Sequence, residues 1–284
     1  MTLFDKSFPV GLATAALVLG LAGGRAVADT AADVALAPHR AIYDLKLAEA
    51  RGKRSLEAVR GRIVYDFSGS ACEGYALQFR QVTELDSGEG KAAVSDLRSI
   101  TWEDGAAKTF RFNSQNYIDS RLIDSVDGIA ERRPDGGVGV TLTKPQEKKA
   151  ELGPVAYPSD HMRRIIAAAR AGQTLIELAV FDGSETGEKI YQSLTVIGRK
   201  IAPDERKPTD AAANAPALAG MARWPVTISY FDNSKHDGEQ TPVYSISFEA
   251  YDNGIARVLV LDYGDFAVTG EMTSLEVKEA KACQ

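Results

Sequence analysis

Two cysteines, Cys72 and Cys283, are the residues of this chain with the clearest chemistry. They lie 211 positions apart, which rules out a CxxC redox motif, and only His39, His161 and His236 could join them in a zinc site. An even number of cysteines in an exported protein usually forms disulfides. We therefore predict one intramolecular bridge between Cys72 and Cys283; the alternative is a pair of buried free thiols.

Other candidate motifs are weak. The Asp182–Ser184 segment lacks the GxSxG pattern of a nucleophile elbow and is better explained as a turn. The acidic segment Asp232–Glu239 lacks the glycine and glutamate of an EF-hand loop, so we expect a hairpin loop there. His39 and His161 have no carboxylate or cysteine at a catalytic spacing. We expect no catalytic residue, cofactor or metal, although paired carboxylates that meet only on folding leave no sequence signature.

The N-terminus resembles a secretory signal. Residues 1–28 contain an apolar run, Val10–Ala22, and end on small residues at Ala28, immediately before Asp29. The run is thirteen residues long, whereas a spanning helix needs roughly 18 or more. We predict cleavage between Ala28 and Asp29, a periplasmic mature protein and no membrane span after cleavage.

The composition limits the class of partner. With 33 basic and 39 acidic residues the chain carries a net charge of −6, and no basic cluster with interleaved aromatics appears. Nucleic acid is therefore excluded as an expected partner, because phosphate binding needs a basic surface. Residues 29–284 are enough for one large domain or two small ones, and we expect one because the predicted bridge would tie its beginning to its end.

Most of the chain alternates apolar and polar residues with a period of two, which is typical of strands with one buried face. These runs lie at 43–47, 63–67, 75–79, around 110–112, and at 138–142, 226–231, 244–248 and 258–263. The turn Asp252–Gly254 predicts a type I′ hairpin between the last two. The fold class is therefore mainly β and largely antiparallel.

One helix is predicted near residues 159–171. Ser159 or Asp160 can cap its first amides, and Gly172 follows where a C′ glycine is expected. Its polar side carries arginines, which fit a solvated face better than an acidic partner. Residues 199–222 have prolines and no period, so we predict a flexible excursion there.

Several segments in order resemble the cell-envelope-integrity EipB family of periplasmic proteins. They run through nearly the whole mature chain, and the near-terminal Cys283 follows the last of them: 38–45, 72–75, 180–184, 228–231, 253–254 and 262–266. The resemblance implies a non-enzymatic protein with a β-spiral, a long antiparallel sheet curled on itself, and a disulfide at the positions of Cys72 and Cys283. By fold analogy with half-open barrels that carry lipids or lipoproteins, it also implies a ligand cleft.

Two functions remain as hypotheses. In the first, the protein is a periplasmic binding or scaffold module that supports envelope integrity through a partner protein or a lipidic ligand. In the second, it is a periplasmic hydrolase of a cell-wall or outer-membrane polymer. Two carboxylates about 5 to 10 Å apart in a cleft, one with a raised pKa, would favour the enzyme. An apolar cleft would favour binding.

Overall fold

The computed structural model describes residues 31, 34–51, 56–88, 92–232 and 241–280. Fourteen strands and one α-helix, α2 (Pro158–Arg170), occur in these ranges, with two short 3-10 helices, η1 (Ala211–Asn214) and η2 (Pro216–Leu218). The strands are β1 (His39–Ala50), β2 (Ala58–Ser70), β3 (Gly74–Asp86), β4 (Ala92–Glu103), β5 (Thr109–Ile118), β6 (Arg121–Arg132), β7 (Val138–Lys144), β8 (Lys148–Leu152), β9 (Leu175–Val180), β10 (Tyr191–Ile197), β11 (Arg223–Asp232), β12 (Tyr244–Tyr251), β13 (Ala256–Asp262) and β14 (Phe266–Val277).

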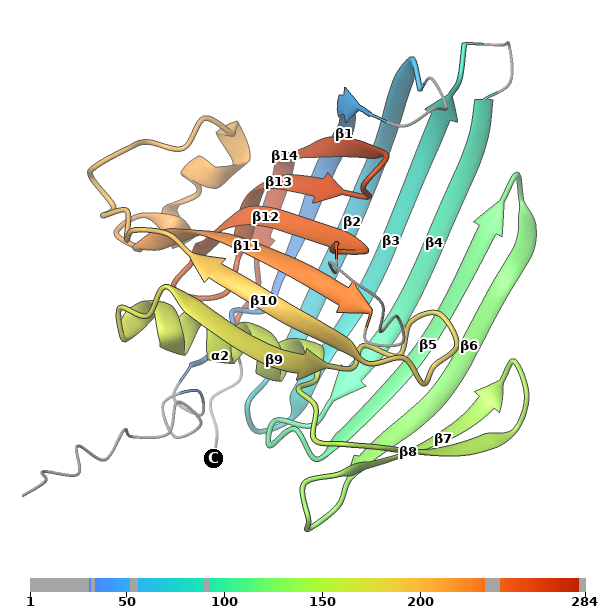
Figure 1. Ribbon diagram of the computed structural model, residues 1–284. Helices are drawn as coiled ribbons and strands as arrows, with labels where there is room; N and C mark the ends of the chain where they lie inside the picture. Colours follow the sequence, from blue (N-terminus) through green and yellow to red (C-terminus); the bar gives the residue numbers. More distant parts are fainter. Residues whose placement is uncertain (1–30, 32–33, 52–55, 89–91, 233–240, 281–284) are drawn as a thin grey trace, which may run out of the picture.

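All strands belong to one antiparallel sheet in the order β8-β7-β6-β5-β4-β3-β2-β1-β14-β13-β12-β11-β10-β9. The first strand therefore lies beside the last, and successive hairpins extend the sheet on both sides of that pair (Figure 1). The end strands β8 and β9 do not pair with each other, so the sheet is curled but not closed. The predicted fold class, a mainly β protein with a curled antiparallel sheet and one clear helix, is confirmed.

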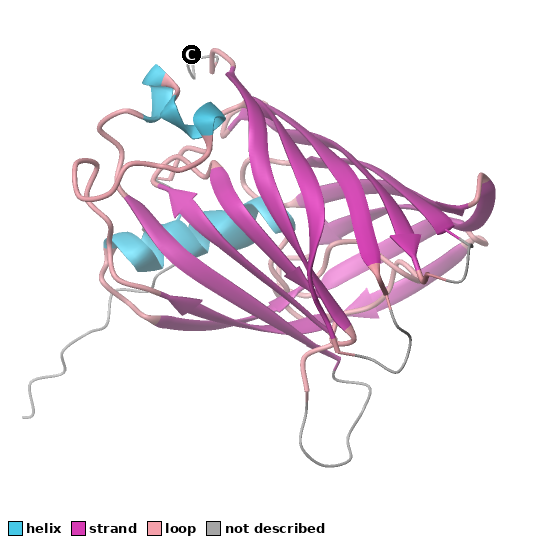
Figure 2. Ribbon diagram, turned by 90° about the horizontal axis from the view of Figure 1, so that it is seen from above, coloured by secondary structure: helices cyan, strands magenta, loops and turns pink. Residues whose placement is uncertain are grey.

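Helix α2 lies between the walls of the curled sheet (Figure 2). Its side chains are buried on several sides, including Ile165, Ile166 and Ala168, so it fills the curl. Gly172 has φ 73° and donates its amide to Ala169 O at 3.1 Å, as a C′ glycine should. None of the helices in the described part of the chain is long and apolar enough to cross a membrane.

Two details of the predicted helix were wrong. The N-cap is Tyr157, which makes no side-chain capping bond, because the first amides are bound by a carboxylate from β4, as shown below. The polar face is not simply solvated: Arg163 is 7% exposed and donates to Gly105 O at 2.8 Å. Arg164 pairs with Asp160 at 2.9 Å.

The hairpin between β12 and β13 is confirmed, but the predicted type I′ turn was wrong. Type I′ needs positive φ at both central residues, and here only Gly254 has it, at 86°. The Gly254 amide donates to Tyr251 O at 2.9 Å, and the Tyr251 amide donates to Ile255 O at 2.8 Å. This is a three-residue loop in which a left-handed glycine follows an ordinary turn.

The connection between β9 and β10 crosses toward β5 and β6 on the other side of the opening (Figure 1). Phe181, at its start, packs edge-on against Phe110 and Phe112 of β5. A Cβ at Gly187 would come within 2.7 Å of side chains on β6 and β7, so only glycine allows this approach. Lys148 of β8 also pairs with Glu188 at 2.8 Å. This loop links the two ends of the open sheet.

The 199–222 segment has little regular structure, as its composition indicates, yet it is anchored. Ala213 and Leu218 are buried in the main hydrophobic core. Ile201 and Arg223 exchange backbone hydrogen bonds of 2.8 and 3.1 Å. The flexibility of this excursion stays a prediction, and these buried anchors argue against it.

Candidate functional site

An apolar cavity lies between α2 and the inner face of the sheet. It has two adjoining lobes of about 270 and 200 Å³. The residues that line both lobes are His39, Tyr65, Met162, Ile246, Phe248 and Gly254. Because Met162 projects from α2 into the wall that the lobes share, the helix divides the space that the sheet encloses.

Aromatic rings form one wall of this cavity. Strand alternation turns every second residue of β1 and β2 inward, and the register sets His39 opposite Phe67. The His39 ring stacks on Tyr65 with centroids 5.4 Å apart, and Phe67 stacks on Tyr75 of β3 at 5.2 Å. The wall is therefore a continuous aromatic ladder across three strands.

A second ladder crosses the opposite half of the sheet. Tyr230 stacks on Tyr244 at 6.0 Å, and Tyr263 stacks on Phe266 at 4.9 Å. The smaller lobe approaches solvent beside this ladder, where Gln81 donates to the partly exposed Tyr263 hydroxyl at 3.3 Å. Aromatic walls with a polar group near the surface are typical of sites for largely apolar ligands.

Two buried histidines belong to the cavity wall. Burial lowers the pKa of His39, whose Nδ1 lies 2.8 Å from Ala37 O. Burial lowers the pKa of His161 to about 4, and Arg164 adds to this effect. His161 Nε2 lies 3.3 Å from the Ser193 hydroxyl, which donates to Leu178 O at 3.0 Å. Both rings are neutral near pH 7, and the serine proton is already bound to a carbonyl oxygen.

One carboxylate has a strongly raised pKa, but it is not in the cavity wall. Burial raises the pKa of Glu103 to about 7, against the opposing effect of the Ser159 and Asp160 amides. These amides donate to its two oxygens at 2.6 and 2.8 Å. Glu103 therefore caps the N-terminus of α2 from β4.

The described residues of the cavity lining do not include the pair of carboxylates that glycoside hydrolysis uses. Among the described residues that line it, Asp182 is the only carboxylate. Its Oδ1 accepts the Ser184 amide at 2.9 Å, and Gly183 between them has φ 70°. Asp182–Ser184 is thus the turn that the sequence indicated.

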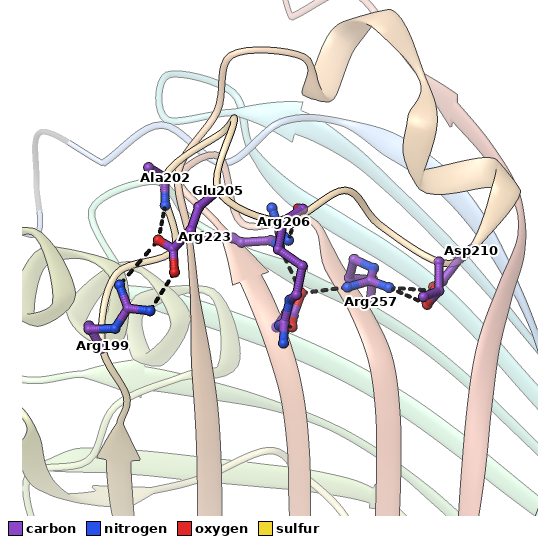
Figure 3. Close-up of polar contacts among 9 residues, drawn as sticks. Arg199, Ala202, Glu205, Arg206, Asp210, Arg223 and Arg257 are labelled. Carbon is purple, nitrogen blue, oxygen red and sulfur yellow. Dashed lines mark hydrogen bonds and ion pairs between the residues drawn. The ribbon is translucent and has the colours of Figure 1, made fainter.

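A second polar cluster lies under the 199–222 excursion (Figure 3). Glu249 Oε2 accepts from Arg223 Nε at 2.7 Å and from Arg257 Nη1 at 2.5 Å. Arg257 Nη2 also donates to Asp210 Oδ1 at 2.6 Å, and Arg206 pairs with the other oxygen of Glu249. Burial alone would raise the pKa of Glu249, but the hydrogen bond from Arg223 and the charge of Arg257 hold it below its ordinary value.

This cluster is an anchor and not an open site. Arg223 and Arg257 are 1% and 3% exposed, so each guanidinium depends on its carboxylate partners. Beside the cluster, Arg199 donates to Glu205 at 3.1 Å, and Glu205 also accepts the Ala202 amide at 3.2 Å (Figure 3). These contacts attach the excursion to β11, β12 and β13.

Several predicted site residues lie outside the described part of the chain. Cys72 lies in the turn between β2 and β3, but Cys283 is outside the described residues, so their pairing stays a prediction. The described residues also exclude the predicted cleavage site at Ala28 and Asp29. They exclude His236 as well, and they include only the first residue, Asp232, of the segment Asp232–Glu239. Within the described ranges, no three His, Cys, Asp or Glu side chains converge to hold a metal ion.

Sequence reasoning anticipated an inner face of Tyr, Phe and Leu, but it missed the charged residues. Strand alternation places Arg223 and Glu249 on the outer face, opposite inward residues such as Phe248, and charged side chains are common there. They are buried because the 199–222 excursion covers this face, and no local pattern in the sequence marks that. Arg257 follows a different rule. It pairs with Glu249 on the same outer face, next to a bulge at which Val258 has φ 53°, and an irregularity of this kind has no clear sequence mark.

Comparison with known proteins gives consistent matches. The sequence profile of the EipB-like family matches residues 30–279. The cell envelope integrity protein EipB of Brucella abortus (strain 2308) is 39% identical over 265 residues, which cover 93% of this chain and 92% of that protein. A crystal structure from Brucella abortus, described as a beta-barrel-like protein of domain of unknown function DUF1849, is 38% identical with a TM-score of 0.79. The alignment covers 87% of this chain and 100% of that one.

Proposed function

This chain belongs to the EipB-like family, and from that premise we propose that it is a non-enzymatic periplasmic protein that supports cell-envelope integrity by holding a lipidic ligand. A protein partner would then receive or present that ligand. The cavity under α2 is the observation that carries the proposal, since its walls are aromatic and aliphatic.

The size of the cavity supports this function. Ligand pockets usually measure about 300–1,000 Å³. Each lobe, of about 270 and 200 Å³, is smaller than that range, whereas the two together fall inside it. The unbranched Met162 side chain between them has three rotatable bonds, so it can change rotamer and connect the lobes.

The hydrolase hypothesis finds less support. The raised pKa belongs to Glu103, both of whose oxygens hold helix amides, and Asp182 has no carboxylate partner in the lining. Hydrolysis of a glycan would need two carboxyl groups on either side of the scissile bond.

Narrowing the cavity should weaken ligand binding. We expect the Met162→Trp variant, which fills the wall between the lobes, to bind a fluorescent fatty acid at least about tenfold more weakly, a loss of about 1.4 kcal/mol. The measurement is a fluorescence titration of purified protein, with native mass spectrometry of protein from envelope extracts to identify co-purifying lipids.

The matched control is Val196→Trp, at a position on β10 that is 48% exposed and outside the cavity. It should bind like the original protein. Equal affinity of all three proteins, or no lipid and no saturable binding of the fatty acid in any of them, would remove the cavity from the proposed function.

A further inference from the structure

A separate groove of about 480 Å³ lies on the outer face of the sheet, across β3 to β7. Phe112 of β5 faces inward, so its neighbours Arg111 and Asn113 face outward. The register aligns these two with Trp102 and Ile100 of β4. None of the outward-facing side chains that line this groove also lines the cavity under α2.

The floor of the groove is apolar. Trp102 lies against Gly74, where an added Cβ would come within 2.8 Å of the indole ring. Ile100, beside it, is 60% exposed, which is unusual for a large aliphatic side chain. The groove thus presents a partly exposed indole next to an exposed aliphatic side chain.

The far wall of the groove is polar and held in place. Asn113 donates its amide to Asp127 Oδ2, and Thr143 donates its hydroxyl to Asp127 Oδ1. These two hydrogen bonds lower the pKa of Asp127, so its carboxylate is ionised near pH 7. Each oxygen keeps a further lone pair that can accept a ligand hydroxyl.

Arg111 supplies a positive charge at the edge of the floor. Its guanidinium carbon lies 5.6 Å from the centroid of the Trp102 ring, and the side chain is exposed. Among the described residues it has no hydrogen-bond or ion-pair partner. Its donors are available to an anion, which a guanidinium binds through two parallel hydrogen bonds.

We propose that this outer groove binds an acidic oligosaccharide. The C–H face of a sugar ring stacks on the Trp102 indole, ring hydroxyls donate to Asp127, and a carboxylate or phosphate on the sugar pairs with Arg111. The groove has the size of a small-ligand pocket, and a protein partner would instead bury about 800 Å² on each side. Asp127 is the only carboxylate among the described residues of the lining, so the site holds a glycan without cleaving it.

Tryptophan fluorescence can test this directly, because the other tryptophan, Trp224, is 4% exposed. We expect a saturable fluorescence change with tetragalacturonate or with N-acetylglucosamine 1-phosphate, and a much weaker one with neutral chitotetraose. A response to only one of the two acidic probes identifies whether the anion is a carboxylate or a phosphate. Equal affinity for the neutral and acidic probes would overturn the role of Arg111.

Variants followed by calorimetry separate the contributions of the side chains. Arg111→Gln and Trp102→Ala should each weaken binding of the acidic probe by about tenfold or more. Arg60→Gln removes an exposed positive charge on β2 and should leave affinity unchanged. Absence of binding at millimolar probe, or binding that survives both groove substitutions, would refute the proposal. Because Met162→Trp leaves the groove intact, failure here is distinguishable from failure of the cavity function.

Discussion

Glu103 shows how one residue can link the sheet to the helix that fills it. It is the last residue of β4 and 3% exposed, and its carboxylate binds two amides of the first turn of α2. Tyr157 offers no side-chain cap, so this distant carboxylate supplies what a local Ser or Asp usually would. Its raised pKa is the cost of burying that charge.

The stability of the protein should therefore depend on Glu103 and pH. A carboxyl group whose pKa rises from 4.5 unfolded to about 7 folded favours folding most below pH 4.5, and this contribution is lost as pH rises through 7. The loss amounts to about 3 kcal/mol. Urea unfolding from pH 4.5 to 8 should show this slope in the original protein but not in Glu103→Gln, which stays neutral.

The difference between the two unfolding curves isolates this group. His161 has a lowered pKa and makes stability fall as pH falls, in the opposite direction, but it is present in both proteins. Parallel pH curves for the two proteins would show that Glu103 does not titrate in this range.

At the scale of elements, a buried ion cluster attaches the 199–222 excursion to the edge of the core. The bulge at Val258 interrupts the regular pairing of β12 and β13 next to the point where Arg257 meets Glu249. Asp210, from the excursion, binds the same guanidinium. The 199–222 excursion is thereby held in place by charged side chains of β11, β12 and β13 and by its own Asp210.

Removing Glu249 should destabilise the protein strongly. Glu249→Ala leaves Arg223 without its carboxylate partner and Arg257 with only Asp210, so we expect a loss of about 3–5 kcal/mol in urea unfolding. Trypsin should also cut the excursion faster. Arg206→Ala removes a side chain that is 60% exposed and should cost less than about 1 kcal/mol. Equal effects of the two substitutions would contradict the anchor.

At the scale of the whole molecule, the pairing of β1 with β14 brings the two ends of the domain together. His39 pairs with Phe67 on β2 and with Val277 on β14, and both of these strands run antiparallel to β1. From that row, β2 continues toward the turn that holds Cys72, and β14 ends at Val277. The Lys278 amide donates to Pro38 O at 2.8 Å, just past that row.

This arrangement supports the predicted disulfide. Strands β2 and β14 lie two strand spacings apart, about 10 Å, whereas the six residues from Val277 to Cys283 can span about 20 Å. The approaches to both cysteines therefore start close enough for a bridge, although Cys283 is outside the described residues.

The bridge can be tested by thiol chemistry. Denatured, unreduced protein from the envelope should show no reactive thiol, whereas reduced protein should show two. A loop of this length stabilises by at most roughly 5 kcal/mol, so Cys72→Ser should lower the melting temperature by about 10 °C. Cys283→Ser should match it, and the double variant should lose no more. Labelling of both cysteines without reductant would refute the bridge.

The sequence by itself determined the repetitive parts of this protein. Alternating residues such as Tyr43, Leu45 and Leu47 mark strands because side-chain burial in a sheet has a period of two, and Gly172 marks the helix end for an equally local reason. Strand β4 was not predicted from this alternation, because few of its side chains are buried on either face. The curl of the sheet was predicted from the family resemblance, because periodicity alone does not indicate how a sheet curves.

Only the tertiary structure decided which residues form sites. The cavity joins β1, β12 and α2, the helix cap joins Glu103 to Ser159, and the outer groove joins Trp102 to Asp127. Each depends on strand order, register and curl, which bring together side chains that lie far apart along the chain. Such contacts leave no local pattern, because long-range pairing and not neighbouring sequence sets their geometry.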